Sequence, residues 1–120
     1  MLRQVALKRA PPIAVLTDRG TGSSGEAIAV AFTGGPDTRF FGDTTLGAAT
    51  ATFAVKLSDG AQIYLVVSTM LNRHDNEYPT GITPNEEILS DATLSWNESV
   101  LRAASEWLSK RRACQLAATK

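Results

Sequence analysis

An apolar run, a glycine-rich turn and a helical pattern follow one another near the start of the chain, and this order constrains the fold most. Residues 13–16 read IAVL after two prolines, which predicts a short strand buried on both faces. Residues 18–23 include two glycines, and a helical pattern then runs from Ser24 until Gly34 stops it. We therefore expect a strand, a tight turn and a helix, as in an α/β domain.

The next segments predict two further pieces of β-structure. Residues 38–41 fit a second short strand that ends at a glycine. Alternating apolar residues over 51–57 and 63–67 flank Asp59-Gly60, a turn signal, and predict a hairpin. We expect residues 63, 65 and 67 to share one face. In the preceding helix, we expect Ile28, Ala31 and Phe32 to share the buried face.

The last third of the chain predicts a loop and a terminal helix. Residues 71–84 are polar and rich in turn-forming residues, so they predict a loop. A helix is expected over 98–112, with residues 115–120 frayed beyond it. Ser95 and Glu98 fit a capping box, and Asn97 is the competing cap, with Trp96 packed on Leu101. The apolar stripe of the helix comprises Val100, Leu101, Ala104, Trp107 and Leu108.

Composition argues against several functions. The chain has 12 basic and 12 acidic residues, and this zero net charge disfavours nucleic acid or an anionic membrane as partner. No apolar run is long enough to span a membrane, and residues 1–12 do not fit a signal peptide. With Cys114 as the single cysteine and one histidine, we expect no disulfide within the chain, no metal site and no cofactor.

The turn GTGSSGE allows two interpretations. Ser23 and Glu26 fit an S-x-x-E capping box, in which the serine accepts from a helix N–H and the glutamate reaches back. Alternatively, Ser23 is a nucleophile on a tight corner, where unpaired N–H groups at the helix start stabilise an oxyanion. Gly22 and Gly25 leave room for a substrate on either side, and Ser24 is the second candidate nucleophile.

Four segments together resemble one peptidase family. PIAVLTDRGTGSSGEAIAVAF contains a T-x-S-x-x-E motif after a strand, and TRFFGDTTLGAAT resembles a strand followed by a Thr-x-Gly loop. FAVKLSDGAQIYLVVS resembles the family's hairpin, and GITPNEEI its G-I-x-P-D-x-x-V element. In this order, over residues 12–88, they are similar to the C-terminal processing (tail-specific) serine peptidases and their tricorn-core relatives.

The resemblance implies an α/β fold of crotonase and Clp-protease type, built from ββα units, of which this chain would be the C-terminal part. Residues 1–11 would be a lead-in, 12–90 the C-terminal half of a catalytic core, and 91–120 a helix and tail. Ser23 matches the nucleophile, and the Ser24 backbone N–H one oxyanion donor. Gly22, Gly25 and Glu26 are the supporting residues. The implied reaction is hydrolysis of a peptide or protein substrate through an acyl-enzyme.

Several departures leave the general base unassigned. The bacterial processing branch uses a lysine after the Thr-x-Gly loop, and Ala48 stands there; Lys56 lies in the hairpin and alternates outward. The tricorn-like branch uses a histidine upstream of the serine, which would lie outside this chain. The glycine-rich loop that supplies the second oxyanion donor is also missing, and Asn85 replaces the usual aspartate.

Two loop residues are weak candidates for the missing role. His74 is the single histidine, but the segment RHDNEY resembles a variable loop, where a solvated histidine is expected. Glu77 is near the place where the tricorn-like branch has an acidic residue that orients its base. Without a base of its own, the chain is expected to have little or no proteolytic activity in isolation.

Two non-catalytic functions stay open at this point. Interphotoreceptor retinoid-binding protein has the same fold type, so a module for apolar ligands or peptides, with a groove between residues 28–32 and the hairpin, is one alternative. A fragment that folds as a homo-oligomer, or by pairing with an N-terminal half, is the other. Resemblance to the family also suggests a secreted or bacterial envelope location.

Overall fold

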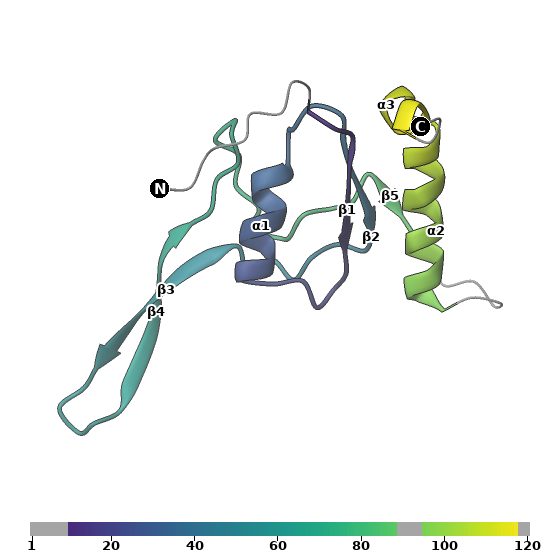
Figure 1. Cartoon of the computed structure of the whole chain (residues 1–120). Helices are drawn as coiled ribbons and strands as arrows, with labels where there is room; N and C mark the ends of the chain where they lie inside the picture. The colour runs from purple at the N-terminus through teal and green to yellow at the C-terminus, as the bar shows by residue number, and fades with distance from the viewer. Residues whose placement is uncertain (1–9, 89–94, 118–120) are drawn as a thin grey trace.

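The computed structural model describes residues 10–88 and 95–117 and has a mixed α/β fold (Figure 1). The expected boundaries at residues 90 and 91, and most of the lead-in, lie outside the described residues. The elements in chain order are β1 (Ile13–Thr17), α1 (Ser24–Phe32), β2 (Thr38–Gly42), β3 (Thr50–Lys56), β4 (Gln62–Thr69), β5 (Glu86–Glu87), α2 (Trp96–Ser109) and α3 (Arg112–Ala117).

A three-stranded parallel sheet in the order β1-β2-β5 forms the centre of the fold. The β1 and β2 strands predicted from sequence are both confirmed, and they pair from Ile13 with Thr38 to Thr17 with Gly42. The expectation that β1 is buried throughout is wrong, since Leu16 is 42% exposed. The reason is position: β1 is an edge strand in the described sheet, whereas β2 lies between two neighbours.

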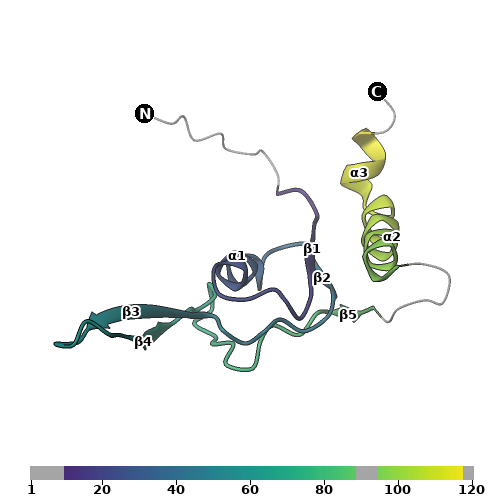
Figure 2. The same ribbon diagram turned by 90° about the horizontal axis from the view of Figure 1, so that it is seen from below.

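Helices α1 and α2 cover opposite faces of this sheet (Figure 2). Successive side chains of β2 point to opposite faces, so Phe40 enters the core under α1 and Phe41 the core under α2. Phe40 packs with Val30 of α1, and Phe41 packs with Val100 of α2. Phe41 also meets the Trp107 ring edge to face at 5.8 Å. These two adjacent residues of β2 thus contribute to the hydrophobic cores on both faces of the sheet.

The buried face of α1 differs from the predicted one. Ile28 is 64% exposed and Ala31 is exposed as well, so these two positions do not face the sheet. Glu26, Ala29 and Val30 are buried instead, at the i, i+3, i+4 spacing of one helical face. The prediction was based on apolar residues alone, whereas a charged residue, Glu26, is the one that this helix buries most completely.

Strands β3 and β4 form the predicted antiparallel hairpin, with Asp59 and Gly60 in its turn. The Leu57 nitrogen donates to the Ala61 carbonyl at 2.8 Å and closes that turn. The pairing of β3 with β4 contains a β-bulge, because Ala51 pairs with Ser68 but Thr52 pairs with Val66. Val67 is therefore the extra residue of the bulge and interrupts the regular pairing that the alternating pattern predicts.

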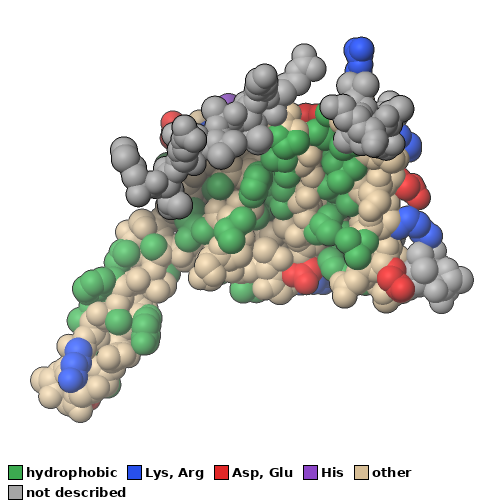
Figure 3. All heavy atoms as spheres, in the orientation of Figure 1, with side chains coloured by type: hydrophobic (Ala, Val, Ile, Leu, Met, Phe, Trp, Pro, Cys, Tyr) green, Lys and Arg blue, Asp and Glu red, His purple; other side chains and the backbone are tan. Residues whose placement is uncertain are grey.

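The hairpin projects as an arm from the rest of the molecule (Figure 1), with hydrophobic side chains along it (Figure 3). Phe53 is 63% exposed and its cross-strand partner Leu65 is 50% exposed. The radius of gyration is 18.2 Å, against about 14 Å for a compact domain of this length. Such an outline is that of a partial domain rather than of a complete one.

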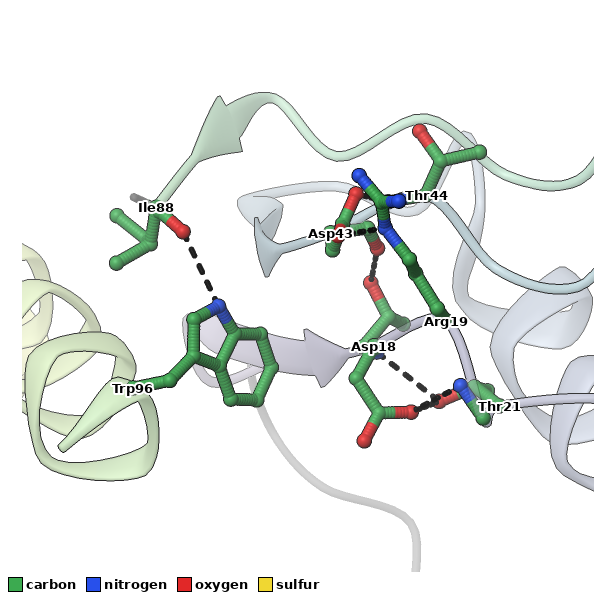
Figure 4. Close-up of polar contacts among 9 residues, drawn as sticks. Asp18, Arg19, Thr21, Asp43, Thr44, Ile88 and Trp96 are labelled. Atoms are coloured by element: carbon green, nitrogen blue, oxygen red, sulfur yellow. Dashed lines mark hydrogen bonds and ion pairs between the residues drawn. The ribbon is translucent and has the colours of Figure 1, made fainter. Parts of the chain in front are cut away.

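Helix α2 begins with the predicted capping box. Ser95 accepts from the Glu98 nitrogen, and the Glu98 side chain accepts from the Ser95 nitrogen. Asn97 lies inside the helix, so it is not the cap. The Trp96 indole donates to the Ile88 carbonyl at 3.1 Å, which fixes the helix start to the end of β5 (Figure 4).

The end of the chain departs from prediction in three ways. Helix α2 stops at Ser109, and a second helix, α3, follows over Arg112–Ala117 where fraying was expected. The expected tail beyond residue 117 lies outside the described residues. Leu101 of the predicted stripe is 55% exposed, whereas Val100 and Ala104 are buried as expected. Among the helices of the described residues, none is long and apolar enough to cross a bilayer.

Candidate active site

The turn after β1 is ordered by the carboxylate of Asp18 (Figure 4). The Gly20 nitrogen and the Thr21 hydroxyl both donate to Asp18 Oδ1, at 3.0 Å and 2.9 Å. The Thr21 nitrogen also donates to the Asp18 carbonyl at 3.0 Å. These local hydrogen bonds make residues 18–21 an Asx-type turn, which delivers the chain to Ser23 in a fixed direction.

The end of β2 lies beside this turn. The Asp43 nitrogen donates to the Thr17 carbonyl at 2.9 Å, so the loop after β2 starts against the end of β1. A hydrogen-bonded ion pair joins Arg19 to Asp43 (Figure 4). The hydrogen bond from Arg19 lowers the pKa of Asp43, and the same bond raises the pKa of Arg19. Since Arg19 is largely exposed, this pair contributes little to stability.

Ser23 is exposed at the junction between the turn and α1, with φ of 51° and ψ of −115°. A positive φ is unfavourable for a residue with a side chain, and such strain gathers at functional sites. The Ser23 side chain makes no capping hydrogen bond to α1. The serine half of the predicted Ser23–Glu26 capping box is therefore not formed. Ser23 thus lies at a sharp strand-to-helix turn and is exposed to solvent.

The first turn of α1 provides the environment of the Ser23 hydroxyl. Ser24 is exposed and is the first helical residue, so its N–H is one of those without a partner inside the helix. The Ala27 nitrogen donates to the Ser23 carbonyl at 2.9 Å. At Gly22 a Cβ atom would lie 2.8 Å from the Leu46 side chain, so the turn approaches the loop after β2 closely at this residue.

Glu26 is fully buried and holds that loop with its carboxylate. Thr45 Oγ1 and the Gly47 nitrogen donate to Oε1 at 2.5 Å and 2.7 Å, and the Ala48 nitrogen donates to Oε2 at 2.6 Å. Burial by itself raises the pKa of Glu26, but the hydrogen bonds from Thr45, Gly47, Ala48 and Ser23 outweigh it and hold the pKa below its ordinary value. The carboxylate therefore acts as an acceptor for several donors.

The same network reaches the segment before β5. The Ile82 nitrogen donates to Thr45 Oγ1 at 2.8 Å, so this hydroxyl links Glu26 to Ile82. Gly81 has φ of 91°, and a Cβ atom there would lie 2.3 Å from the Thr45 carbonyl oxygen. The serine turn, the loop after β2 and the GITP segment are thus packed as one unit. All three segments carry motifs of the family resemblance, but nothing in the sequence pattern indicates that Glu26 joins them.

The structure does not bring His74 to Ser23. The His74 ring packs on Gly34, just beyond the C-terminal end of α1, within 2.6 Å of where a Cβ would stand. Ser23 precedes the N-terminal end of that helix, which has 9 residues and is about 13 Å long. Glu77 accepts from the Thr69 hydroxyl at 3.2 Å, at the end of β4, and is likewise not joined to Ser23.

Neither Ala48 nor Lys56 places an amine at the serine. Ala48 lies in the loop that Glu26 holds, but it carries only a methyl group. Lys56 is the last residue of β3, near the tip of the projecting arm (Figure 1). In the part of the chain that the structure describes, three or more possible metal ligands do not gather anywhere.

Asn85 stands where the resemblance implies an aspartate, and its side chain attaches the segment before β5 to β2. The Phe40 nitrogen in β2 donates to Asn85 Oδ1 at 2.8 Å, and this hydrogen bond joins the segment before β5 to β2. A carboxylate would offer an oxygen acceptor of the same reach. This departure from the motif therefore preserves the attachment of residues 81–85 to the sheet.

An apolar cleft of about 380 Å³ lies between the serine turn and α2. It is lined by Leu16, Thr17, Asp18, Thr21, Trp96, Asn97, Val100 and Leu101. Leu16 and Leu101 are partly exposed, so the cleft has hydrophobic walls open to solvent. Figure 3 shows hydrophobic side chains gathered across this face between α1 and α2.

Comparisons with known proteins point to one family. The model of peptidase family S41 matches residues 3–88. A nisin-resistance protein of Lactococcus lactis subsp. lactis is 40% identical over 99 residues, which are 80% of this chain and 31% of that protein.

Solved structures of other proteins are also similar to this chain. A lipoprotein from Streptococcus agalactiae is similar with a TM-score of 0.67 at 30% identity, over 86% of this chain and 33% of that one. The photosystem II D1 C-terminal processing protease is similar with a TM-score of 0.58 at 28% identity, over 76% of this chain and 24% of that one. The chain thus spans about a third or less of the length of these relatives.

Proposed function

The chain belongs to peptidase family S41, and from this premise we propose that it carries the nucleophile half of a serine peptidase site, with Ser23 as nucleophile. The observation that supports this most is the Ser23 backbone, held at φ of 51° with the side chain exposed and free of the helix cap. A helix start that only needed a cap would have no reason to hold serine in a strained conformation.

The proposed reaction has two steps. Ser23 Oγ attacks the scissile carbonyl while a general base accepts its proton, and the amine leaves with a proton to give an acyl-enzyme. Water then hydrolyses the ester and frees the serine. The Ser24 N–H, at the positive end of α1, faces the developing oxyanion as one of its donors. A peptide substrate would lie extended along a strand edge.

We propose that the base and the second oxyanion donor come from outside this chain, upstream or from another molecule. The position of His74 beside Gly34, beyond the other end of α1, supports this, as do the position of Lys56 at the end of β3 and the methyl group at Ala48. Residues 12–90 would then be the C-terminal half of a catalytic core of ββα units, followed by a helix and tail over 91–120. An envelope or secreted location is proposed from the relatives, which include a lipoprotein.

Labelling with a fluorophosphonate probe tests this function. We expect the 120-residue chain to react slowly, and Ser23→Ala to abolish even that reaction. Ser24→Ala is the matched control, because it removes the neighbouring hydroxyl but keeps the backbone N–H. Labelling that survives Ser23→Ala and disappears with Ser24→Ala would reject Ser23 as nucleophile. Strong labelling of the chain alone would reject the proposal that it lacks a base.

The apolar cleft supports a second candidate, a binding module for apolar ligands. It lies between β1 and α2 rather than between α1 and the hairpin, where a groove was expected. Saturable binding of a fluorescent fatty acid that Leu101→Ser weakens and Ser23→Ala leaves unchanged would favour this function. Absence of saturable binding would reject it.

A further inference from the structure

The Glu26 carboxylate is the buried group that the proposed chemistry does not use. It is fully buried in α1, yet it receives three hydrogen bonds from the loop after β2, two of them from backbone nitrogens. A helix surface residue would be solvated, and a simple capping glutamate would bond only to its own helix. The contacts of Glu26 instead connect two segments that lie about 20 residues apart in the chain.

We propose that Glu26 is a positioning residue for Ser23, because its carboxylate clamps the first turn of α1 to the loop that contains Thr45, Gly47 and Ala48. This role rests on the proposed function only in so far as Ser23 is the nucleophile.

A second contact ties the same loop to the serine turn. The Leu46 nitrogen donates to the Thr21 carbonyl at 2.9 Å, two residues before Ser23. The turn is thereby held on both sides of Ser23, by Leu46 before it and by Glu26 after it. Two attachments that flank a residue with positive φ can maintain that strained conformation, which an isolated turn would relax.

The chemistry of the contacts requires a carboxylate. All groups that meet the Glu26 side chain are donors, either a hydroxyl or a backbone N–H. Glutamine has nearly the same shape, but its NH₂ group is a donor and would face another N–H. Glu26→Gln should therefore release one side of the clamp with almost no change in packing volume, and this makes it the informative variant.

The test is nuclear magnetic resonance of the 120-residue chain. The HN–Hα coupling and Cα shift of Ser23 report its φ, and amide exchange reports the hydrogen bonds of Gly47 and Ala48. For Glu26→Gln we expect loss of the positive-φ signature and exchange faster on the order of tenfold or more at Gly47 and Ala48. Val30→Ala is the control, since it removes buried volume from the same helix face but none of the hydrogen bonds to the Glu26 carboxylate.

The outcomes separate the alternatives. A Ser23 signature that persists in Glu26→Gln, or that Val30→Ala removes equally, overturns the positioning role. Should Glu26→Gln fail to fold, Thr45→Val is the second variant, because it removes one donor to the Glu26 carboxylate. We expect Thr45→Val to change the Ser23 signature less than Glu26→Gln would. Thr45→Ser keeps the hydroxyl, so we expect it to keep the wild-type signature. A Ser23 signature that Thr45→Val leaves unchanged also overturns the proposal.

Probe labelling then distinguishes positioning from function. If Ser23 is the nucleophile, Glu26→Gln should slow fluorophosphonate labelling on the order of tenfold or more, because a misplaced nucleophile reacts poorly. If the wild-type chain proves unreactive while its Ser23 conformation depends on Glu26, the positioning role stands and the nucleophile assignment fails.

Discussion

The backbone nitrogen of Ala48 lies 2.6 Å from the carboxylate of Glu26, in a loop that also contacts the serine turn through Leu46. Residue 48, where the resemblance implies the lysine of the bacterial processing branch, therefore lies in a loop held by contacts to both α1 and the serine turn, and its side chain here is a methyl group.

This relationship predicts a gain of function. Ala48→Lys should speed fluorophosphonate labelling of Ser23 about tenfold or more, since a positioned general base contributes on the order of 10² to 10⁴ in rate. The Glu26 carboxylate already accepts from three donors in the loop, so it should not capture the new amine. Ala48→Met, of similar length without charge, is the control. Equal rates in the two variants would mean that residue 48 does not face Ser23.

Glycine substitutions separate steric contact from backbone conformation. Gly81 and Gly60 both have φ of 91°, but a Cβ at Gly81 would lie 2.3 Å from the Thr45 carbonyl, and one at Gly60 meets nothing within 4 Å. Both alanine variants carry the conformational cost of roughly 1 kcal/mol or more. We expect Gly81→Ala to lose at least about 2 kcal/mol beyond Gly60→Ala in urea unfolding. Equal losses would contradict the tight contact with Thr45.

The contact of Asn85 with Phe40 predicts tolerance of the family's own residue. Asn85→Asp should leave stability within about 0.5 kcal/mol, because the carboxylate can accept from the Phe40 nitrogen as the amide oxygen does. Asn85→Ala should lose about 1–2 kcal/mol, since that backbone N–H is left without its partner. Thermal unfolding of the three forms measures both effects, and equal melting of Asp and Ala variants would refute the acceptor role.

Acid should remove the contribution of Glu26. Its pKa is lowered in the folded state, so its stabilisation is complete above the ordinary value of 4.5 and is lost as pH falls through the folded pKa. At neutral pH we expect Glu26→Gln to lose about 2–3 kcal/mol. Denaturant unfolding at several pH values should show this difference shrinking below pH 4.5. A difference independent of pH would contradict the charged carboxylate of Glu26 as the source of this stabilisation.

Three features with local sequence signals were predicted correctly. Strand β1, the hairpin turn at Asp59-Gly60 and the Ser95–Glu98 cap each depend on residues close together in the chain, and each is confirmed. The burial of Glu26 could not be predicted in the same way, because it depends on contacts with the loop after β2, which is distant in the chain. The conformation of Ser23 belongs to this second group, since periodicity carries no information on a positive φ.

The sequence separation between hydrogen-bonded residues also has a consequence for the order of folding. The capping hydrogen bonds of α2 join residues three apart, whereas those from Thr45 to Glu26 and from Ile82 to Thr45 span 19 and 37 residues. Closing long loops costs entropy before any contact compensates for it, so local structure forms first. The hairpin and α2 should therefore assemble early, and the serine turn should take its final conformation late, when α1, the loop after β2 and the GITP segment meet.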